Sequence, residues 1–335
     1  MDSQKPTTGI LIVSHGSQRA EANRGFEAMV ARVASRVEGA AILPAFFSLV
    51  HPDIPEQIEL LASRGVQRVL VMPYFLYSGQ HVLVDIPAVL DQCRRRFPCL
   101  TIELLATLEN DPALEDLLVE RLLPLAETEH PLPLAAAEIE QQSYRIIERQ
   151  LADWRSQDRG ADWIVRRVVH ATADGSFART MRIHPEATAR GCAALAEGKP
   201  VLCDVKMLQA GMTKVRGEIL CAIDRPEVVQ LAEARGCTRA AAAMEYLAPR
   251  MEGAIVAVGN APTALWQILD IAARGGPRPA VVVGLPIGFV GARQSKLALL
   301  ASDLCYITNT SPRGGSPAAA AAVNVLALMA EGKLE

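Results

Sequence analysis

The sequence predicts an α/β protein of two layered domains, the first with a parallel sheet of flavodoxin-like strand order. The chain has 335 residues, enough to bury two separate cores. Short apolar runs alternate with longer amphipathic segments on both sides of a proline-rich stretch at 124–138, which is typical of sheets covered by helices. Half of the residues are hydrophobic, yet no apolar run reaches the roughly 18 to 20 positions of a membrane span.

The first domain is expected over residues 1–125. Its strands are expected at 9–14, 41–47, 66–75 and 101–108. Its helices are expected at 20–37, 54–65, 84–97 and 113–123. Because the strands read as nearly unbroken apolar runs, they are expected to be buried in a parallel sheet, for which the common order is 2-1-3-4.

The linker is expected at 126–135, where prolines interrupt both periodicities. The second domain, expected over 136–335, opens with an amphipathic helix and again alternates strands with helices. Its strands are expected at 201–205, 219–223, 254–259 and 280–286. Its helices are expected at 138–154, 225–236, 238–251, 261–275 and 315–332, several of them with a capping residue or proline at the start and glycine at the end.

The composition excludes several classes of protein. The seven cysteines are odd in number and lack CxxC spacing, which argues against a disulfide framework and a structural zinc site. The N-terminal MDSQKPTTG lacks the basic and apolar regions of a secretion signal, so a cytoplasmic protein is expected. After position 135 there are 23 basic against 20 acidic residues, which suits an anionic ligand. No lysine-rich tract is interleaved with aromatic residues, so no nucleic-acid partner is expected.

The first candidate site lies after three strands of the first domain. His15 directly follows the first strand, in ILIVSHGS. Ser48 and His51 follow the second strand, and His81 and Asp85 follow the third. Ligands of open parallel sheets bind at the carboxyl ends of the strands. In the order 2-1-3-4 these strands are neighbours, so three histidines are expected to converge at one edge.

Converging histidines point to a metal. Neutral imidazole is a common ligand of transition metals, and a few imidazoles with open coordination positions bind such an ion without caging it. His15, His81 and His51 are therefore candidate ligands. A phosphate site is the competing interpretation, but SHGS lacks the lysine and glycine spacing of a P-loop.

The same segments resemble the small-type sirohydrochlorin chelatases, over about residues 8–125. The resemblance rests on ILIVSHGS, AFFSLVHPDIPEQI and MPYFLYSGQHVLVDIP. This family inserts cobalt, or nickel or iron in relatives, into a tetrapyrrole without ATP. The resemblance implies that His15 and His81 hold the incoming metal and take up the pyrrole protons that it displaces. Many members have a glutamate where Ser48 stands, and His51 is a candidate replacement for it.

The second candidate site centres on His170, in RRVVHATADGSF, where an apolar run again leads to a histidine just before a turn. A purely structural histidine is the alternative. Basic side chains at helix starts and loops suit ligands that carry carboxylates, although each is equally compatible with a solvated surface. The further binding candidates are Ser143, Thr213, Lys214, Arg239, Asn260 and Lys296.

Residues 136–335 resemble precorrin-8X methylmutase, through EIEQQSYRIIERQL, VVHATAD, VLCDVKMLQAGMTK, VGNAPTAL and VGLPIGFVGARQSK. This family moves a methyl group from C-11 to C-12 of the corrin-forming macrocycle, formally a 1,5-sigmatropic shift. The resemblance implies that His170 donates and recovers a proton, that Ser143 contacts the substrate and that Arg239 is an active-site partner. Lys214 and Arg239 are candidate clamps for the substrate carboxylates.

Together the two resemblances imply a bifunctional enzyme of cobalamin synthesis that forms homodimers through its second domain. Its expected substrates are sirohydrochlorin, cobalt and cobalt-precorrin-8, with no organic cofactor. Two alternatives stay open. One is a monofunctional methylmutase whose first domain only binds a tetrapyrrole or a metal. The other is a non-enzymatic corrinoid-binding module, against which the lack of a DxHxxG element argues.

Overall fold

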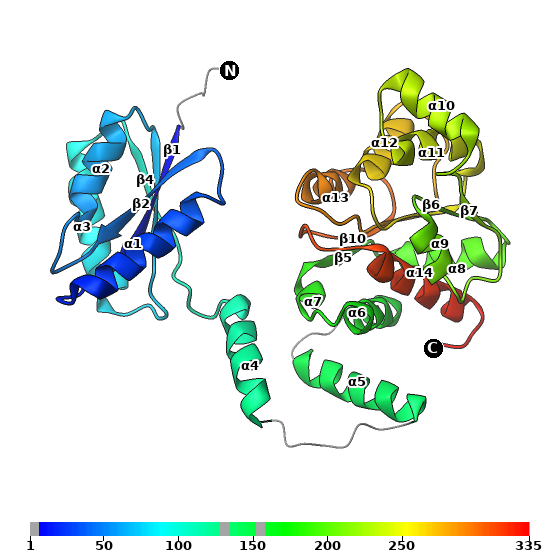
Figure 1. Ribbon diagram of the computed structural model, residues 1–335, viewed down its shortest axis with the longest axis horizontal. Helices are drawn as coiled ribbons and strands as arrows, with labels where there is room; N and C mark the ends of the chain where they lie inside the picture. Colours follow the sequence, from blue (N-terminus) through cyan, green and yellow to red (C-terminus); the bar gives the residue numbers. More distant parts are fainter. Residues whose placement is uncertain (1–6, 127–134, 152–157, 335) are drawn as a thin grey trace. The chain divides into compact units, whose positions relative to one another are not determined.

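The computed structural model describes residues 7–126, 135–151 and 158–334 (Figure 1). The chain divides into two compact units, Met1–Pro131 and Leu132–Glu335. Most of the linker predicted at 126–135 lies outside the described residues. Within the described ranges, the helices all lack the length and apolar character needed to cross a membrane.

The first unit is a four-stranded parallel sheet in the order β2-β1-β3-β4, which confirms the predicted strand order. Its strands are β1 (Thr8–Ser14), β2 (Ala40–Phe46), β3 (Arg68–Pro73) and β4 (Thr101–Leu104). Its helical elements are α1 (Ala20–Ala34), α2 (Ile54–Ser63), a π-helical turn η1 (His81–Asp85), α3 (Ile86–Arg96) and α4 (Pro112–Ala126).

Helices cover both faces of this sheet. Phe26 and Val30 of α1 pack with Ile12 and Phe46 on one face. Residues of α2 and α3 pack on the other face with alternate strand positions such as Leu11. Because the side chains of a strand alternate between faces, each strand must be apolar on both, which explains its unbroken apolar sequence.

The second unit is a six-stranded sheet in the order β5-β10-β9-β8-β6-β7, in which only β5 is antiparallel to its neighbour. The four predicted strands are present as β6 (Val201–Cys203), β7 (Ile219–Cys221), β8 (Ile255–Val258) and β9 (Val281–Gly284). The other two strands, β5 (Met181–Ile183) and β10 (Tyr306–Asn309), were not predicted from the sequence.

Two helix layers enclose the second sheet. The first layer packs with residues such as Val201 and Ile255 and consists of α5 (Ala136–Gln150), α6 (Arg159–Thr172), α7 (Ser176–Thr180), α8 (Ala187–Ala196), α9 (Lys206–Gly211) and α14 (Ser316–Ala330). The opposite layer packs with residues such as Leu202 and Val256 and contains α10 (Pro226–Arg235), α11 (Arg239–Leu247), η2 (Ala248–Arg250), α12 (Pro262–Ala273) and α13 (Ala292–Leu300).

The stretch RRVVH, which leads to the second candidate histidine, is the end of helix α6 rather than a strand. Helix α14 lies beside α6 in the first layer (Figure 1). Its N-terminus approaches the end of β8 closely, since a Cβ on Gly259 would lie 2.8 Å from the Ser316 Cα atom. Small residues at this point allow α14 to lie directly on the sheet.

Candidate functional sites

The first site is held by the loops that follow β1 and β2. The Ser14 carbonyl accepts a hydrogen bond from the Phe47 amide at 2.8 Å, and the His15 carbonyl accepts one from the Ser48 amide at 3.0 Å. Gly16 has a φ of +88°, and a Cβ there would lie 2.2 Å from the Ser48 carbonyl oxygen. Only glycine fits this turn, so the two loops hold His15 at the end of the sheet.

His15 and His81 lie side by side, with ring centroids 5.2 Å apart. His81 begins the π-helical turn before α3, and its Nδ1 lies 2.7 Å from an Asp85 carboxylate oxygen. The Phe47 ring packs against the His81 ring, with centroids 4.8 Å apart. A carboxylate on Nδ1 fixes the orientation of the ring and leaves Nε2 for a ligand. This is the arrangement that a metal-binding imidazole requires.

Exposed apolar residues lie in the same segments of the chain as His81 and in the loops that follow β2 and β3. Leu83 and Val84 belong to the same π-helical turn as His81 and are 65% and 53% exposed. Further exposed apolar residues follow β2 and β3, namely Leu49, Tyr74, Leu76 and Tyr77. Parallel strands end at one edge of the sheet, so these groups gather where the imidazoles lie. Such a rim suits a large, flat and partly apolar ligand.

The structure does not bring His51 into this pair, which corrects the expected convergence of three histidines. Its Nδ1 lies 3.0 Å from the Glu56 carboxylate, and Glu56 forms the capping box of α2 with Asp53. The hydrogen bond that His51 donates to Glu56 raises the pKa of His51. Among the described residues, His51, Asp53 and Glu56 form the single group of three potential metal ligands within 4.8 Å. That group is explained by helix capping.

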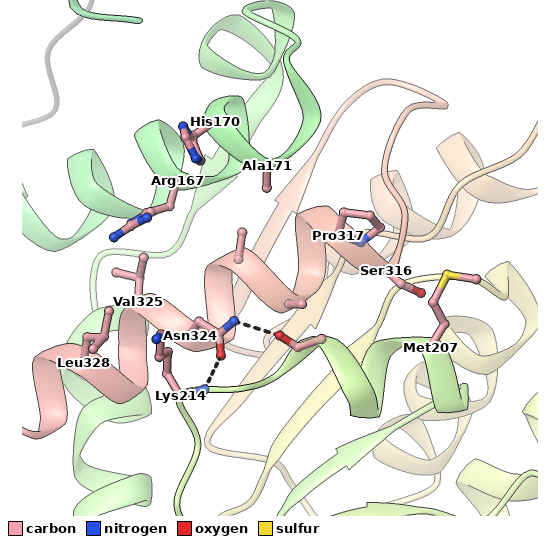
Figure 2. Close-up of a pocket in the computed structure, with 13 residues that line it drawn as sticks. Arg167, His170, Ala171, Met207, Lys214, Ser316, Pro317, Asn324, Val325 and Leu328 are labelled. Atoms are coloured by element: carbon pink, nitrogen blue, oxygen red, sulfur yellow. Dashed lines mark hydrogen bonds between the residues drawn. The ribbon is translucent and has the colours of Figure 1, made fainter. Parts of the chain in front are cut away.

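The second site is a cavity of about 420 Å³ between α6, α9 and α14 (Figure 2). His170 lies in the last turn of α6, and Arg167 of the same helix also lines the cavity. Lys214 borders it from the loop after α9. The apolar wall comes largely from α14 and includes Pro317, Ala320, Ala321, Val325 and Leu328. The cavity thus combines basic groups with an apolar surface.

Tyr144 of α5 stacks on the His170 ring, with centroids 5.2 Å apart and planes 7° from parallel. The Arg167 guanidinium lies 5.4 Å from the centre of the Tyr144 ring and donates to Glu140 at 3.1 Å. His170 Nδ1 is buried, and the described residues provide no hydrogen-bond partner for it. A fixed imidazole that lines a cavity is suited to proton transfer.

Asn324 fixes the loop that carries Lys214. Its side chain donates to the Gly211 carbonyl at 2.9 Å and accepts from the Lys214 amide at 3.0 Å (Figure 2). Lys214 itself is exposed and so is the preceding residue, Thr213. The loop is therefore ordered while the lysine side chain remains available to an anion.

The other predicted binding residues lie in different places. Ser143 is half-buried on α5, next to Tyr144. Arg239 is exposed at the start of α11, in the opposite helix layer from His170. Asn260 is exposed, and its amide donates to the buried Asp204 carboxylate at 2.8 Å. Burial raises the pKa of Asp204, although main-chain hydrogen bonds oppose this effect. Of these residues, Ser143 is placed close to the His170 stack.

Lys296 is fully buried and does not line the cavity, contrary to its expected role in substrate binding. Its ammonium group donates to the carbonyls of Arg313 and Pro286 at 2.7 and 3.1 Å. These carbonyls belong to the loops after β10 and β9. Burial lowers the pKa of Lys296 to about 7. The lysine thus joins two loops from inside the protein.

This burial predicts a pH dependence of stability. The pKa of Lys296 is about 7 in the folded protein and 10.5 ordinarily, so the unfolded chain binds the extra proton between these values. The free energy of unfolding is therefore expected to rise with pH from 7 to 10.5. Lys296→Met should remove this rise and leave two carbonyls unpaired, which costs about 1–3 kcal/mol each. Denaturant unfolding at pH 7 and 9.5 measures both effects.

Lys333→Met, which replaces an exposed lysine, is the control and should show the same pH dependence as the wild type. If Lys296→Met also gained as much stability between pH 7 and 9.5 as the wild type, the assignment would be refuted.

Tyr144, Arg167 and Asn324 were not predicted from the sequence. Arg167 and His170 are three residues apart, which places them on one face once the segment is known to be a helix. Asn324 is a lone polar residue in the apolar run AAVNVLA, a pattern that indicates a specific hydrogen bond. Tyr144 gave no separate signal, because an aromatic residue on an amphipathic helix is ordinarily part of the core.

Fold and sites define a two-domain α/β enzyme, with a histidine pair at the end of the first sheet and a histidine at an apolar cavity in the second domain. The chain belongs to the precorrin-8X methylmutase family, whose model matches residues 138–329. The model of a second family, CbiX, matches residues 9–125, so the chain is a fusion of the two.

Curated relatives match the second domain. The cobalt-precorrin-8 methylmutase of Priestia megaterium is 36% identical over 206 residues, covering 60% of this chain and 91% of its own length. The precorrin-8X methylmutase of Pseudomonas aeruginosa is 42% identical over 167 residues, covering 48% of this chain and 80% of its own length. The solved precorrin-8X methylmutase from Thermus thermophilus is 35% identical with a TM-score of 0.53, covering 60% of this chain and 99% of its own.

Proposed function

We propose that this protein is a bifunctional enzyme of cobalamin biosynthesis. The second domain isomerises cobalt-precorrin-8 by moving a methyl group from C-11 to C-12, which gives the cobyrinic acid framework. The observation that carries this proposal is that His170, held by the stacked Tyr144 ring, lines an apolar cavity. Conversion of cobalt-precorrin-8 by the purified chain, followed by its absorption spectrum, tests the activity.

Proton transfer explains how His170 acts. The imidazole gives a proton to the ring nitrogen next to the migrating methyl group. The conjugated system becomes electron-poor, which weakens the bond to the methyl group and favours the shifted isomer. The same nitrogen of the product then returns the proton to the imidazole. A histidine suits both transfers because its pKa ordinarily lies near neutrality.

The remaining acceleration comes from holding the macrocycle in one geometry. Lys214 borders the cavity and is our candidate to bind a peripheral carboxylate, with Thr213 as its neighbour in the sequence. Ser143, which precedes Tyr144 on α5, is a further candidate contact. The apolar face of α14 contacts the ring system and excludes water. Arg239 and Asn260 lie outside this lining, so a role for them would require a substrate that reaches beyond the cavity.

The first domain is proposed to insert cobalt into sirohydrochlorin. His15 and His81 coordinate the incoming Co²⁺, which is a substrate and not a resident cofactor. The ion moves into the macrocycle, the pyrrole nitrogens release their protons, and the imidazoles take these up. Asp85 holds the His81 ring through Nδ1, which leaves Nε2 for the metal.

A second candidate is a monofunctional methylmutase whose first domain only binds metal or tetrapyrrole. Ser48 favours it, because a hydroxyl stands where many chelatases have a carboxylate. His51, the candidate replacement, is held by Glu56 instead. The two functions differ in a direct measurement, since only a chelatase inserts cobalt into sirohydrochlorin faster than the spontaneous reaction.

We further propose a cytoplasmic homodimer that pairs through the second domain. Its loop between β9 and α13 carries three exposed apolar residues, Ile287, Phe289 and Val290, and Phe289 is 100% exposed. Exposed apolar clusters of this kind mark association surfaces. The double substitution Phe289→Ser, Val290→Ser is expected to convert the dimer to a monomer.

Sedimentation velocity of the full chain measures this change. The wild type is expected at about twice the chain mass of 36.0 kDa. Leu118→Ser, which removes an exposed apolar residue from the first unit, is the control and should stay dimeric. A dimer that survives the double substitution would place the interface elsewhere.

A further inference from the structure

Two thiols lie opposite each other in the second sheet. Cys203 and Cys221 are the last residues of β6 and β7, and they pair directly in the parallel register. Both contact the core layer that contains α9 and α14, so their side chains leave the sheet on the same face. Neighbouring strands lie about 4.8 Å apart, which is within the Cα separation that a disulfide spans.

The two thiols differ in environment. Cys203 is fully buried, whereas Cys221 is half-buried on β7, the edge strand. Interaction with the adjacent Cys203 thiol lowers the pKa of Cys221 to about 7, and the nearby Lys206 ammonium acts in the same direction. The same interaction, together with burial, raises the pKa of Cys203. The thiol with the lower pKa is therefore the one on the more accessible edge strand.

We propose that Cys221 and Cys203 form a peroxide-reactive dithiol, with Cys221 as the attacking thiol and Cys203 as the resolving thiol. The Cys221 sulfur attacks one oxygen of hydrogen peroxide, the O–O bond breaks, and the other oxygen leaves as water after taking up a proton. Cys221 becomes a sulfenic acid. The Cys203 sulfur then attacks the Cys221 sulfur, the S–O bond breaks and a second water leaves. The thiols lose two electrons in total and the peroxide gains them.

The other cysteines of the chain lack this combination. Burial raises the pKa of Cys93, Cys192 and Cys305. Cys99 and Cys237 are exposed, and the described structure pairs neither with a second thiol. They therefore serve as internal controls for general thiol oxidation. Cys203 and Cys221 both lie outside the lining of the His170 cavity.

Peptide mass spectrometry of the full chain after equimolar hydrogen peroxide tests the proposal. The expected product joins the peptides of Cys203 and Cys221 with loss of a pair of hydrogen atoms, and dithiothreitol reverses it. In Cys203→Ala, dimedone should trap a sulfenic acid on Cys221. In Cys221→Ala, Cys203 should stay reduced.

Oxidation of Cys237 at least as fast as Cys221, or a Cys221 sulfenic acid that persists in the wild type, would overturn the proposal. A second measurement needs no variant. Iodoacetamide should alkylate Cys221 of the reduced wild type with a pH midpoint near 7 and, at pH 7, on the order of tenfold faster than Cys237. Equal rates for the two thiols would also overturn it.

Discussion

Replacing His170 with alanine is expected to lower kcat for the methyl shift by roughly 100- to 10,000-fold, the usual contribution of a positioned acid–base group. The imidazole lies at the cavity and is oriented by Tyr144, so its removal abolishes proton transfer and leaves the apolar walls intact. The variant should therefore still bind the product. Single-turnover absorption measures the rate, and a spectral titration measures binding.

His184→Ala provides a matched control in the same domain. His184 packs against Tyr306 and accepts a hydrogen bond from the Glu186 amide at 3.2 Å, away from the cavity lining. We expect this control to turn over at the wild-type rate. Normal turnover by His170→Ala would refute the proposed proton transfer, whereas a loss of both turnover and product binding would assign His170 to binding alone.

Replacing His15 or His81 with alanine is expected to reduce cobalt insertion into sirohydrochlorin to the spontaneous rate. Each substitution removes one of the two imidazoles that lie 5.2 Å apart, and a single imidazole gives too weak a site to hold the incoming ion. Asp85→Asn keeps both rings but replaces the carboxylate on His81 Nδ1. We expect it to slow insertion by about 10- to 100-fold. The absorption spectrum of sirohydrochlorin with added Co²⁺ measures all three.

His51→Ala is the control for this series, because His51 pairs with Glu56 and stands apart from the other two histidines. Its insertion rate should stay near that of the wild type. A wild-type rate equal to the spontaneous rate would favour the monofunctional methylmutase. A loss of activity in His51→Ala equal to that in His15→Ala would show that the bound substrate recruits His51.

The sequence predicts the buried strands well, because a strand covered on both faces must be apolar throughout. Strand β10 is buried but is not apolar throughout. Its Thr308 and Asn309 are fully buried and polar, and their side chains bond to the main chain at Gly284 and Arg313. Strand β5 has three residues, too few to show any period. Strand β10 was not predicted because buried polar residues interrupt its apolar pattern, and β5 was not predicted because it is too short to show one.

The proximity of two residues can be predicted where the topology of the sheet decides it. Parallel strands end at one edge, which is why His15 and His81 meet. His51 was expected to join them and does not. Its ring instead forms a hydrogen bond with a local partner, Glu56. Lys296 reads as a surface lysine in ARQSK, and its burial depends on two carbonyls that distant loops supply. Such contacts depend on the three-dimensional path of the chain and leave no local signature.

The stacking of Tyr144 on His170 limits where the chain could be divided into two separate working proteins. Helix α5 is the first described element of the second unit, yet it supplies a ring against the proposed acid–base group and, through Glu140, a partner for Arg167. A fission that released a working isomerase would have to start translation ahead of Glu140. A break one turn further on would leave the imidazole unsupported on one face. A cut that separates the two domains and keeps the isomerase active must therefore lie before Glu140.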